Sequence, residues 1–300
     1  MSASDGPQSR SPKPGRASAD GCPGGGDPSG GAGDGPVADA PAELLKARDD
    51  RRVRAQPVVT GGHDVRRGLV LGGGGVLGFA WMVGALRVLE DEEGFDARGV
   101  DICVGTSAGS ILAALIGMHV GVDAILRHQQ GIPLPADPRI DWDHRTDTGG
   151  PLPPRPNFGV GSPDLLRRAA RHPSRVPPLV AASALLPRGR GTLEPVHRMI
   201  EGLSFALLDG GRRTRSADAT SPWPRRPQTW IVTIDYRSGR RVVLGRAGAP
   251  RASIADAVQA SCAIPAWYPP VMIEGRPYVD GGTWSPASAD LLVDAGLDEV

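Results

Sequence analysis

The chain has 300 residues, and its 34 Lys and Arg side chains nearly balance its 33 Asp and Glu side chains, giving a formal net charge of +1. A chain of this length can bury a sizeable core, so we expect one large α/β domain beside a disordered segment. A near-neutral charge creates no overall field that would attract nucleic acid, and the sequence predicts no nucleic-acid partner.

The cysteine usage and the apolar segments argue against secretion and against a membrane span. Cys22, Cys103 and Cys262 are far apart and form no C-x-x-C motif, which favours a reducing, cytoplasmic location. The first residues lack the basic start and apolar core of a signal peptide. The longest apolar stretch, residues 111–118, is much shorter than the ~20 residues of a membrane-spanning helix. We therefore expect at most peripheral contact with a membrane. The sequence shows no ligand spacing typical of a calcium or zinc site, and we expect no cofactor.

Composition divides the chain near residue 62. Residues 1–62 are dominated by Gly, Pro, Asp, Ser and Ala and have few aromatic or β-branched side chains. Such a segment buries too little apolar surface to offset the entropy lost on ordering, so we predict a disordered arm with a short helix over residues 42–51. We predict that residues 63–300 form a catalytic domain.

The succession of strand, glycine turn and helix occurs twice at the start of this domain. Residues 68–71 are expected to form a buried strand, followed by a glycine run and a helix that ends near Gly94. Residues 101–104 are expected to form a second strand, followed by another turn and an apolar helix through Met118. This repetition is typical of a parallel sheet with crossover helices.

The second turn, residues 105–109, has the sequence G-T-S-A-G and fits the nucleophile elbow G-x-S-x-G. A sharp turn there would lift the hydroxyl of Ser107 clear of the sheet. Gly105 and Gly109 would let the strand and the helix approach without Cβ clashes. The amides at the start of the helix would favour an oxyanion. The five-residue pattern alone is loose, but its position between a strand and a helix favours catalysis over a chance match.

The first glycine run, residues 73–78, allows two interpretations. It fits the dinucleotide fingerprint G-x-G-x-x-G, but the second strand does not end in the acidic residue that would bind a ribose. Alternatively, the backbone amides of Gly73, Gly74 and Gly75 would point at an ester carbonyl held by Ser107 and form an oxyanion hole.

A serine nucleophile needs a base, and histidine is the usual one. An α/β-hydrolase with a Ser-His-Asp triad would carry a late histidine, whereas none of the six histidines here follows His197. Residues 278–282 instead read Y-V-D-G-G, which places Asp280 at a strand end before Gly281 and Gly282. Asp-Gly is also a common turn dipeptide, so only its pairing with the serine motif favours a catalytic role.

Together, the glycine run, the G-T-S-A-G-S segment and the D-G-G segment, in this order, resemble the patatin-like phospholipase family. The segment S-C-A-I-P at residues 261–265 is also similar to the family's sequence before the Asp motif. The resemblance implies a three-layer α/β/α fold with a mostly parallel central sheet. It also implies hydrolysis of lipid acyl esters through an acyl-enzyme, without a cofactor. The family's residue roles then fall on Ser107 as nucleophile, Asp280 as base and the amides of Gly73 to Gly75 as oxyanion donors.

Two features depart from that family. Leu77 stands where the glycine loop often carries Lys or Arg, which would leave oxyanion stabilisation to backbone donors alone. Residues 131–191 are rich in Pro and Arg and are expected to form a cap or lid at the mouth of the site. Within them, a helix from Ser162 to Arg171 would suit an anionic lipid surface or serve only as a solvated connector.

The sequence therefore predicts a patatin-like serine hydrolase of the phospholipase type that acts on a lipid or another acyl ester. Two other functions stay open: an esterase with a Ser-His-Asp triad, and a module that binds a dinucleotide or a lipid without catalysis. Later in the chain, residues 229–236 and 241–244 are expected to form a hairpin whose turn uses Asp235. Cys103 and Cys262 are expected to be small buried side chains.

Overall fold

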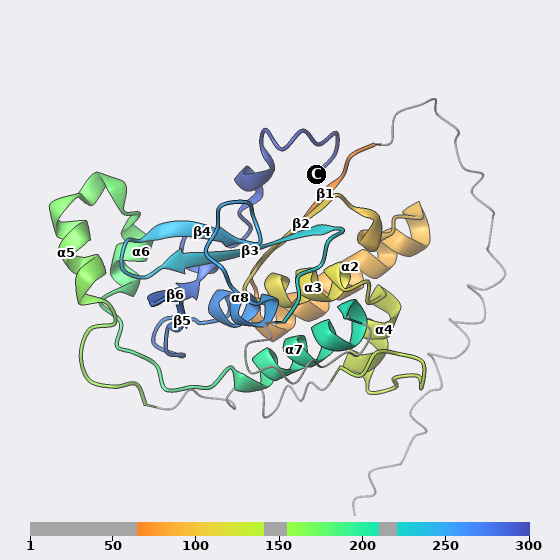
Figure 1. Cartoon of the computed structure of the whole chain (residues 1–300), viewed down its shortest axis with the longest axis horizontal. Coiled ribbons are helices and arrows are strands. Elements are labelled where there is room, and N and C mark those ends of the chain that lie inside the picture. Colours follow the sequence, from red (N-terminus) through yellow and green to blue (C-terminus); the bar gives the residue numbers. More distant parts are fainter. Residues whose placement is uncertain (1–64, 141–154, 210–220) are drawn as a thin grey trace, which may run out of the picture. The chain divides into compact units, whose positions relative to one another are not determined.

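The computed structural model describes residues 65–140, 155–209 and 221–300. The predicted N-terminal arm at 1–62, its helix at 42–51 and a part of the predicted cap lie outside these residues. Within them, the central element is a sheet of six strands with helices on its faces (Figure 1).

The first three strands of the sheet are parallel. They are β1 (Gly68–Leu71), β2 (Ile102–Thr106) and β3 (Gln228–Asp235), and β2 lies between the other two. Helix α2 (Gly75–Glu93) connects β1 to β2, and α3 (Ala108–Gly117) follows β2. Gly94 ends α2 in a left-handed conformation (φ 64°), as expected for a C-terminal glycine. The two predicted strand-turn-helix units are thus confirmed.

The rest of the sheet is antiparallel, whereas the sequence predicted a mostly parallel sheet. Strand β4 (Arg240–Leu244) forms the predicted hairpin with β3, and β6 (Arg276–Asp280) pairs with β3 and with β5 (Val271–Ile273). Short turns join β3 to β4 and β5 to β6, and such turns allow only antiparallel pairing, whereas the antiparallel pair of β3 and β6 joins segments far apart in the chain.

The register of β3 brings together the ends of two other strands. Its residue Val232 pairs with Thr106, the last residue of β2, and the next residue, Thr233, pairs with Asp280, the last residue of β6. The carboxyl ends of β2 and β6 therefore meet beside adjacent residues of one strand, although they are far apart in sequence.

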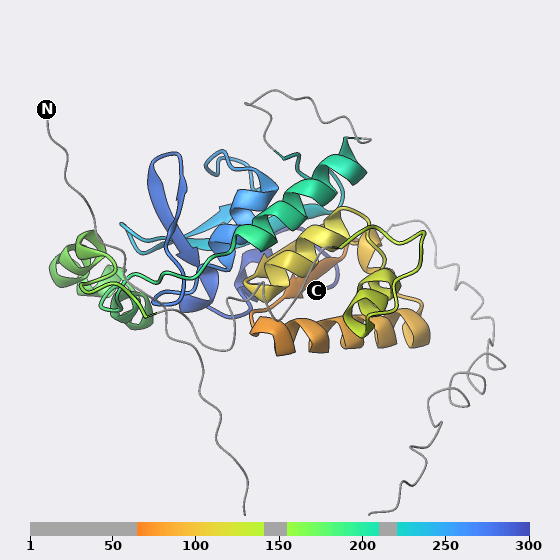
Figure 2. The same ribbon diagram turned by 90° about the horizontal axis from the view of Figure 1, so that it is seen from below.

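One face of the sheet carries the main core. Helix α3, α8 (Ile254–Ser261) and α7 (Glu194–Leu208) cover this face, and α2 and α4 (Val122–Gln130) pack beside α3 (Figure 2). Helix α3 is buried along its whole length, which explains why its sequence is apolar on every side. Ser253 caps α8 by accepting a hydrogen bond of 2.9 Å from the amide of Asp256.

The opposite face of the sheet carries two smaller clusters. Helix α5 (Pro163–Arg171) and α6 (Pro178–Ser183) pack Leu165 and Val180 against Ile234 of β3 and Val279 of β6. The C-terminal segment packs Leu292 against β2 and β3. Because helical layers lie on both faces, the predicted α/β/α class is confirmed. Helix α5 begins and ends as predicted, with the Ser162 hydroxyl accepting a hydrogen bond of 3.2 Å from the amide of Leu165.

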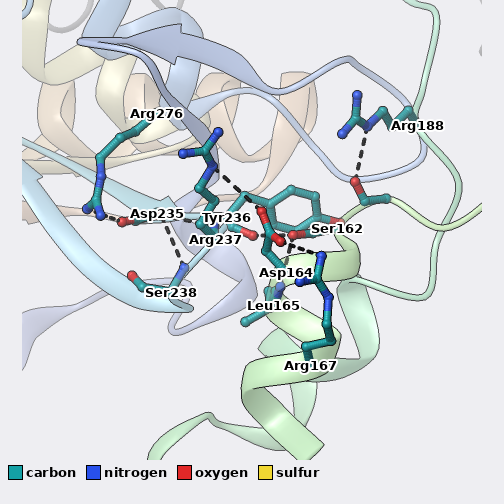
Figure 3. A network of polar contacts seen from close by, with 11 residues as sticks. Ser162, Asp164, Leu165, Arg167, Arg188, Asp235, Tyr236, Arg237, Ser238 and Arg276 are labelled. Atoms are coloured by element: carbon teal, nitrogen blue, oxygen red, sulfur yellow. Dashed lines mark hydrogen bonds and ion pairs between the residues drawn. The ribbon is translucent and has the colours of Figure 1, made fainter.

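Polar contacts fasten α5 and α6 to the end of β3 (Figure 3). The hydroxyl of Ser162 donates to the carbonyl of Tyr236, and the phenol of Tyr236 donates to the carbonyl of Ser183 at 2.6 Å. Asp164 lies 3.8 Å from the guanidinium of Arg237 at the β3–β4 turn. The described part of 155–191 is thus attached to the sheet, and its action as a lid stays a prediction.

Candidate active site

Ser107 lies in the sharp turn between β2 and α3, where the sequence predicted it. Its backbone has φ 53° and ψ −123°, a strained conformation for a residue with a Cβ atom. The amide of Ser107 donates a hydrogen bond of 2.9 Å to the Ser261 hydroxyl, which donates in turn to the carbonyl of Val232 at 2.7 Å. The Ser110 hydroxyl donates to the Ser107 carbonyl at 2.6 Å. These bonds compensate for the strain and hold the turn.

Gly105 and Gly109 allow the close packing that this turn needs. A Cβ atom added to Gly109 would lie 2.1 Å from the carbonyl oxygen of Leu71, and one added to Gly105 would lie 2.5 Å from the carbonyl oxygen of Gly109. Both distances are shorter than any van der Waals contact, so only glycine fits at either position. The packing reason predicted for these two glycines is confirmed.

Asp280 faces Ser107 from the end of β6. The side chain of Ser107 acts on the Asp280 carboxylate from close by and lowers its pKa, and the amide of Gly282 donates a hydrogen bond of 2.7 Å to its Oδ1. Gly281 is needed for packing, because a Cβ atom there would lie 2.5 Å from the carbonyl oxygen of Val232. The structure thus brings together the serine and the aspartate that the sequence singled out.

Burial changes the basicity of Asp280. Only 4% of this residue is exposed, and desolvation raises the pKa of its carboxyl from 3.8 to about 6. The hydrogen bonds from Gly282 and Ser107 lower this pKa, but they offset only part of the effect of burial. A pKa near 6 makes the carboxylate a better proton acceptor than an exposed aspartate while leaving it mostly ionised at neutral pH.

The glycine loop after β1 lies directly against Ser107. A Cβ atom built on Gly73 would be 3.4 Å from the Cβ atom of Ser107. The Gly73 amide already donates a hydrogen bond of 2.8 Å to the carbonyl of Pro286. Among the described residues, the amides of Gly74 and Gly75 have no hydrogen-bond acceptor. The donors that this loop can offer to an oxyanion are therefore those of Gly74 and Gly75.

Ala108 follows Ser107 at the start of α3, and its amide also has no acceptor within the described part of the chain. The G-x-S-x-G pattern contained this signal, since the residue after the nucleophile often supplies an oxyanion donor. Leu77, at the position where the family often carries Lys or Arg, is 84% exposed on the first turn of α2.

A cavity of about 360 Å³ opens beside Ser107 and is mostly apolar. Its wall is built by α2, α3, α4 and α7 together with the segment after α8, and sequence reasoning did not identify it. Side chains that line it include Val76, Ile111, Leu115, Ile125, Val196 and Met199. Apolar residues of four helices thus form a slot that ends at the serine hydroxyl.

Two histidines and one cysteine among the described residues are other candidates for a base or a nucleophile, and each is either engaged in another contact or neutral. His128 also lines the cavity, but its Nε2 is engaged with the carbonyl of Pro138 at 2.8 Å. His197 pairs with Asp256 at 3.1 Å, and this contact raises the pKa of the imidazole. The thiol of Cys262 lies near the Ser107 carbonyl, and burial raises its pKa to about 12. Cys262 is therefore a buried neutral thiol, as predicted, and not a nucleophile.

Among residues 65–140, 155–209 and 221–300, no helix has the length and apolar character needed to cross a membrane. The same residues contain no group of three or more His, Cys, Asp or Glu side chains placed to hold a metal ion.

Comparison with known proteins identifies the family. The family model described as patatin-like phospholipase matches residues 69–293. No curated protein is similar enough to count as a match. Similar solved structures include VipD from Legionella pneumophila, with 16% identity and a TM-score of 0.39 over 73% of this chain and 46% of that one. They also include the type III effector ExoU, with 23% identity and a TM-score of 0.37 over 67% of this chain and 40% of that one.

The chain spans less than half the length of either of these two structures. The family model, in contrast, covers most of the chain, including both glycine turns and the Asp280 segment. This chain belongs to the patatin-like phospholipase family.

Proposed function

We propose that this protein hydrolyses acyl esters of lipids, with Ser107 as nucleophile and Asp280 as general base. Membership in the patatin-like phospholipase family implies lipid acyl hydrolase activity in general. The observation that carries the specific proposal is the meeting of Ser107 and Asp280 at the ends of β2 and β6, beside adjacent residues of β3, in a site where burial raises the pKa of the Asp280 carboxyl to about 6.

The reaction proceeds through two half-reactions that share one proton acceptor. Asp280 accepts the hydroxyl proton as the oxygen of Ser107 attacks the ester carbonyl, and the proton then passes to the departing alcohol. This step leaves an acyl group on Ser107. In the second half-reaction Asp280 takes a proton from water, the hydroxide attacks the acyl-enzyme, and the proton returns to Ser107 as the fatty acid leaves.

The oxyanion of each tetrahedral intermediate needs hydrogen-bond donors. Gly75 and Ala108 line the cavity together with Ser107, Gly74 precedes Gly75, and the amides of all three have no acceptor within the described residues. Fixed backbone donors of this kind stabilise a transition state without reorganisation, and removing one typically costs about 3–4 kcal/mol. The Gly73 amide supports the loop through Pro286 instead, so we assign it a structural role.

The cavity beside Ser107 fits the acyl chain of the substrate. Its lining is mostly aliphatic, which favours a hydrocarbon chain over a polar leaving group. The head group would then lie toward solvent, where the glycine loop and α2 begin.

The exposed side chains at the start of α2 suit contact with a lipid surface. Leu77 and Trp81 are 84% and 73% exposed and are separated by one helical turn, and neighbouring Val76 lines the cavity. Exposed apolar and aromatic side chains next to the entrance would let the protein take a lipid from a membrane. Peripheral membrane contact is therefore part of the proposal.

The decisive experiment combines covalent labelling with three substitutions. Incubation with a fluorophosphonate probe, followed by mass spectrometry, is expected to label Ser107. Turnover of a p-nitrophenyl ester should fall by about 10²-fold or more in both Ser107→Ala and Asp280→Asn. His197→Ala is the matched test of a Ser-His-Asp triad and should keep most of the activity. A label on another residue, full activity in Asp280→Asn or loss of activity in His197→Ala would refute the assignment.

A further inference from the structure

A second concave site lies away from Ser107, between strand β4, helix α5 and the start of β6. It is a groove of about 690 Å³. Its lining shares no residue with the cavity beside Ser107. Five arginines and one carboxylate are its charged lining residues: Arg168, Arg240, Arg241, Arg246, Arg276 and Asp235.

Two of the five arginines are neutralised by carboxylates. Arg276 contacts Asp235 at 2.7 Å (Figure 3), and Arg241 pairs with Asp290. Asp235 has little capacity left to pair with a further arginine. It also accepts hydrogen bonds from the amides of Arg237 and Ser238, and its side chain is only 2% exposed. Asp235 therefore shapes the β3–β4 turn, as predicted, and does not balance the remaining cations.

The other three arginines, Arg168, Arg240 and Arg246, have no carboxylate within ion-pairing distance among the described residues. The Nε atom of Arg168 is enclosed by protein and has no hydrogen-bond acceptor within the described residues. Arg246 lies over the ring of Trp230, with its guanidinium carbon 5.0 Å from the ring centroid. Buried donors are rarely left without an acceptor, and a stacked guanidinium is held in place. Together with the three guanidinium groups that line one groove and have no ion pair within the described part of the chain, these features indicate an anion-binding site.

We propose that this groove binds a phosphate monoester, as a site separate from the one that hydrolyses esters. A phosphate dianion offers several acceptor oxygens to converging guanidinium groups, and the forked geometry of arginine suits phosphate better than an ammonium does. The bound phosphate would accept from Arg168 and would neutralise Arg240 and Arg246. The proposal does not depend on the ester chemistry at Ser107.

Two sources of the phosphate are distinguished by two arms of one binding experiment on the full chain. Glycerol 3-phosphate, measured by calorimetry, represents a soluble phosphate compound. Vesicles of ether-linked phosphatidylcholine containing ether-linked phosphatidic acid, measured by co-sedimentation, represent a lipid head group. Ether lipids cannot be hydrolysed at an acyl ester, so the result is independent of enzyme activity. Vesicles with ether-linked phosphatidylserine at the same surface charge provide the comparison with a phosphodiester.

The test variant is Arg168→Gln/Arg246→Gln, and its matched control is Arg171→Gln/Arg251→Gln. Each control arginine is exposed and close in sequence to a groove residue without lining the groove. We expect the test variant to weaken binding at least about tenfold in whichever arm binds, and the control to bind like the wild type. If the change at Arg168 prevents folding, Arg240→Gln/Arg246→Gln replaces exposed residues only.

Binding in either arm that is weakened in the test variant and kept in the control supports the site. The arm that binds identifies the source of the phosphate. The proposal is overturned if neither probe binds, if the test and control variants lose affinity equally, or if phosphatidylserine vesicles bind as tightly as those with phosphatidic acid.

Discussion

The carboxylate of Asp280 accepts a hydrogen bond of 2.7 Å from the amide of Gly282, and the nearby Ser107 side chain lowers its pKa. Both partners come from turns whose backbone is fixed by glycine packing, so the carboxylate is held in one orientation. The raised pKa of Asp280 affects how activity and stability depend on pH, whereas its fixed position depends on the glycine packing of the two turns.

The raised pKa predicts the pH profile of ester hydrolysis. Desolvation raises the pKa of Asp280 to about 6, and only the ionised carboxylate accepts the serine proton. The ionised fraction at pH 5 is about one tenth of that at pH 7, so kcat/KM for a soluble ester should fall about tenfold between these values. The check is a pH series with a p-nitrophenyl ester, whose profile should fit a single ionisation near 6. A constant rate down to pH 4 would show that another group acts as base.

The same shift predicts that Asp280 destabilises the fold at neutral pH. The folded pKa of about 6 lies above the ordinary value of 3.8, so folding carries no penalty from this group below about pH 4, and the penalty grows as pH rises through 6. At pH 7.5 its size is roughly 3 kcal/mol, from 1.36 kcal/mol per pKa unit. Asp280→Asn should therefore increase the free energy of urea unfolding at pH 7.5 and leave it nearly unchanged at pH 4.

The exposed Asp294 provides the control for this measurement, since Asp294→Asn removes a carboxylate without relieving burial. Its effect on unfolding should be small at both pH values. A destabilised Asp280→Asn protein at pH 7.5 would contradict the assigned cause of the pKa shift.

The glycine packing at the nucleophile turn predicts opposite effects for two similar substitutions. Gly109→Ala would put a methyl group 2.1 Å from the carbonyl oxygen of Leu71 and should destabilise the protein by about 3 kcal/mol or more. Gly84→Ala lies within α2, where the new methyl group meets no atom within 4 Å, and should stabilise by about 0.5–1 kcal/mol. Thermal unfolding of the two variants measures both effects, and a tolerated Gly109→Ala would mean that β1 and α3 are less tightly packed.

The cavity lining predicts how acyl chain length can be changed. Val196→Phe adds a ring inside the cavity, so long acyl chains should lose about tenfold more kcat/KM than acetyl esters. Val88→Phe, on the exposed face of α2, makes a similar change in size outside the cavity and should leave the chain-length preference as it is. The measurement is kcat/KM of both variants for a series of esters from acetyl to palmitoyl. Equal losses for all chain lengths in Val196→Phe would place the acyl chain elsewhere.

The apolar side chains at the start of α2 predict a difference between dispersed and membrane substrates. Trp81→Gln removes a side chain that is 73% exposed in the free protein and would enter the lipid surface. Hydrolysis of phospholipid vesicles should fall about tenfold more than hydrolysis of a monomeric ester. Leu207→Gln, on α7, removes a less exposed apolar side chain away from the cavity lining and serves as the comparison. Parallel losses on both substrates would exclude a membrane-binding role for Trp81.

Local signals in the sequence were sufficient for several of the elements, including the turn that carries Ser107. The strand before the glycine run, the turn at Ser107 and the helix after Ser162 are set by residues within a few positions of one another, and the structure has them where they were expected. In the antiparallel half of the sheet only the hairpin of β3 and β4 was foreseen, because the pairing of Thr233 with Asp280 joins distant segments. Helix α8 was also missed, although Ser253 and Asp256 carried its capping signal.

Properties that depend on burial could not be read from the sequence. The pKa of Asp280 follows from desolvation by segments far away in the chain, and a reference value of 3.8 was the only one available beforehand. The hydrogen bond from the Gly73 amide to the Pro286 carbonyl likewise joins residues that are far apart in the sequence. The groove around Arg168 and Arg246 was hidden for the same reason, since its arginines come from different elements.

Adjacent residues of β3, Val232 and Thr233, hold the last residues of β2 and β6 in place. The register of these two β3 residues therefore sets the spacing between Ser107 and Asp280. Loops elsewhere between residues 107 and 280 can lengthen, shorten or be exchanged during evolution without altering that spacing, whereas a single-residue insertion between Val232 and Thr233 would separate the two groups.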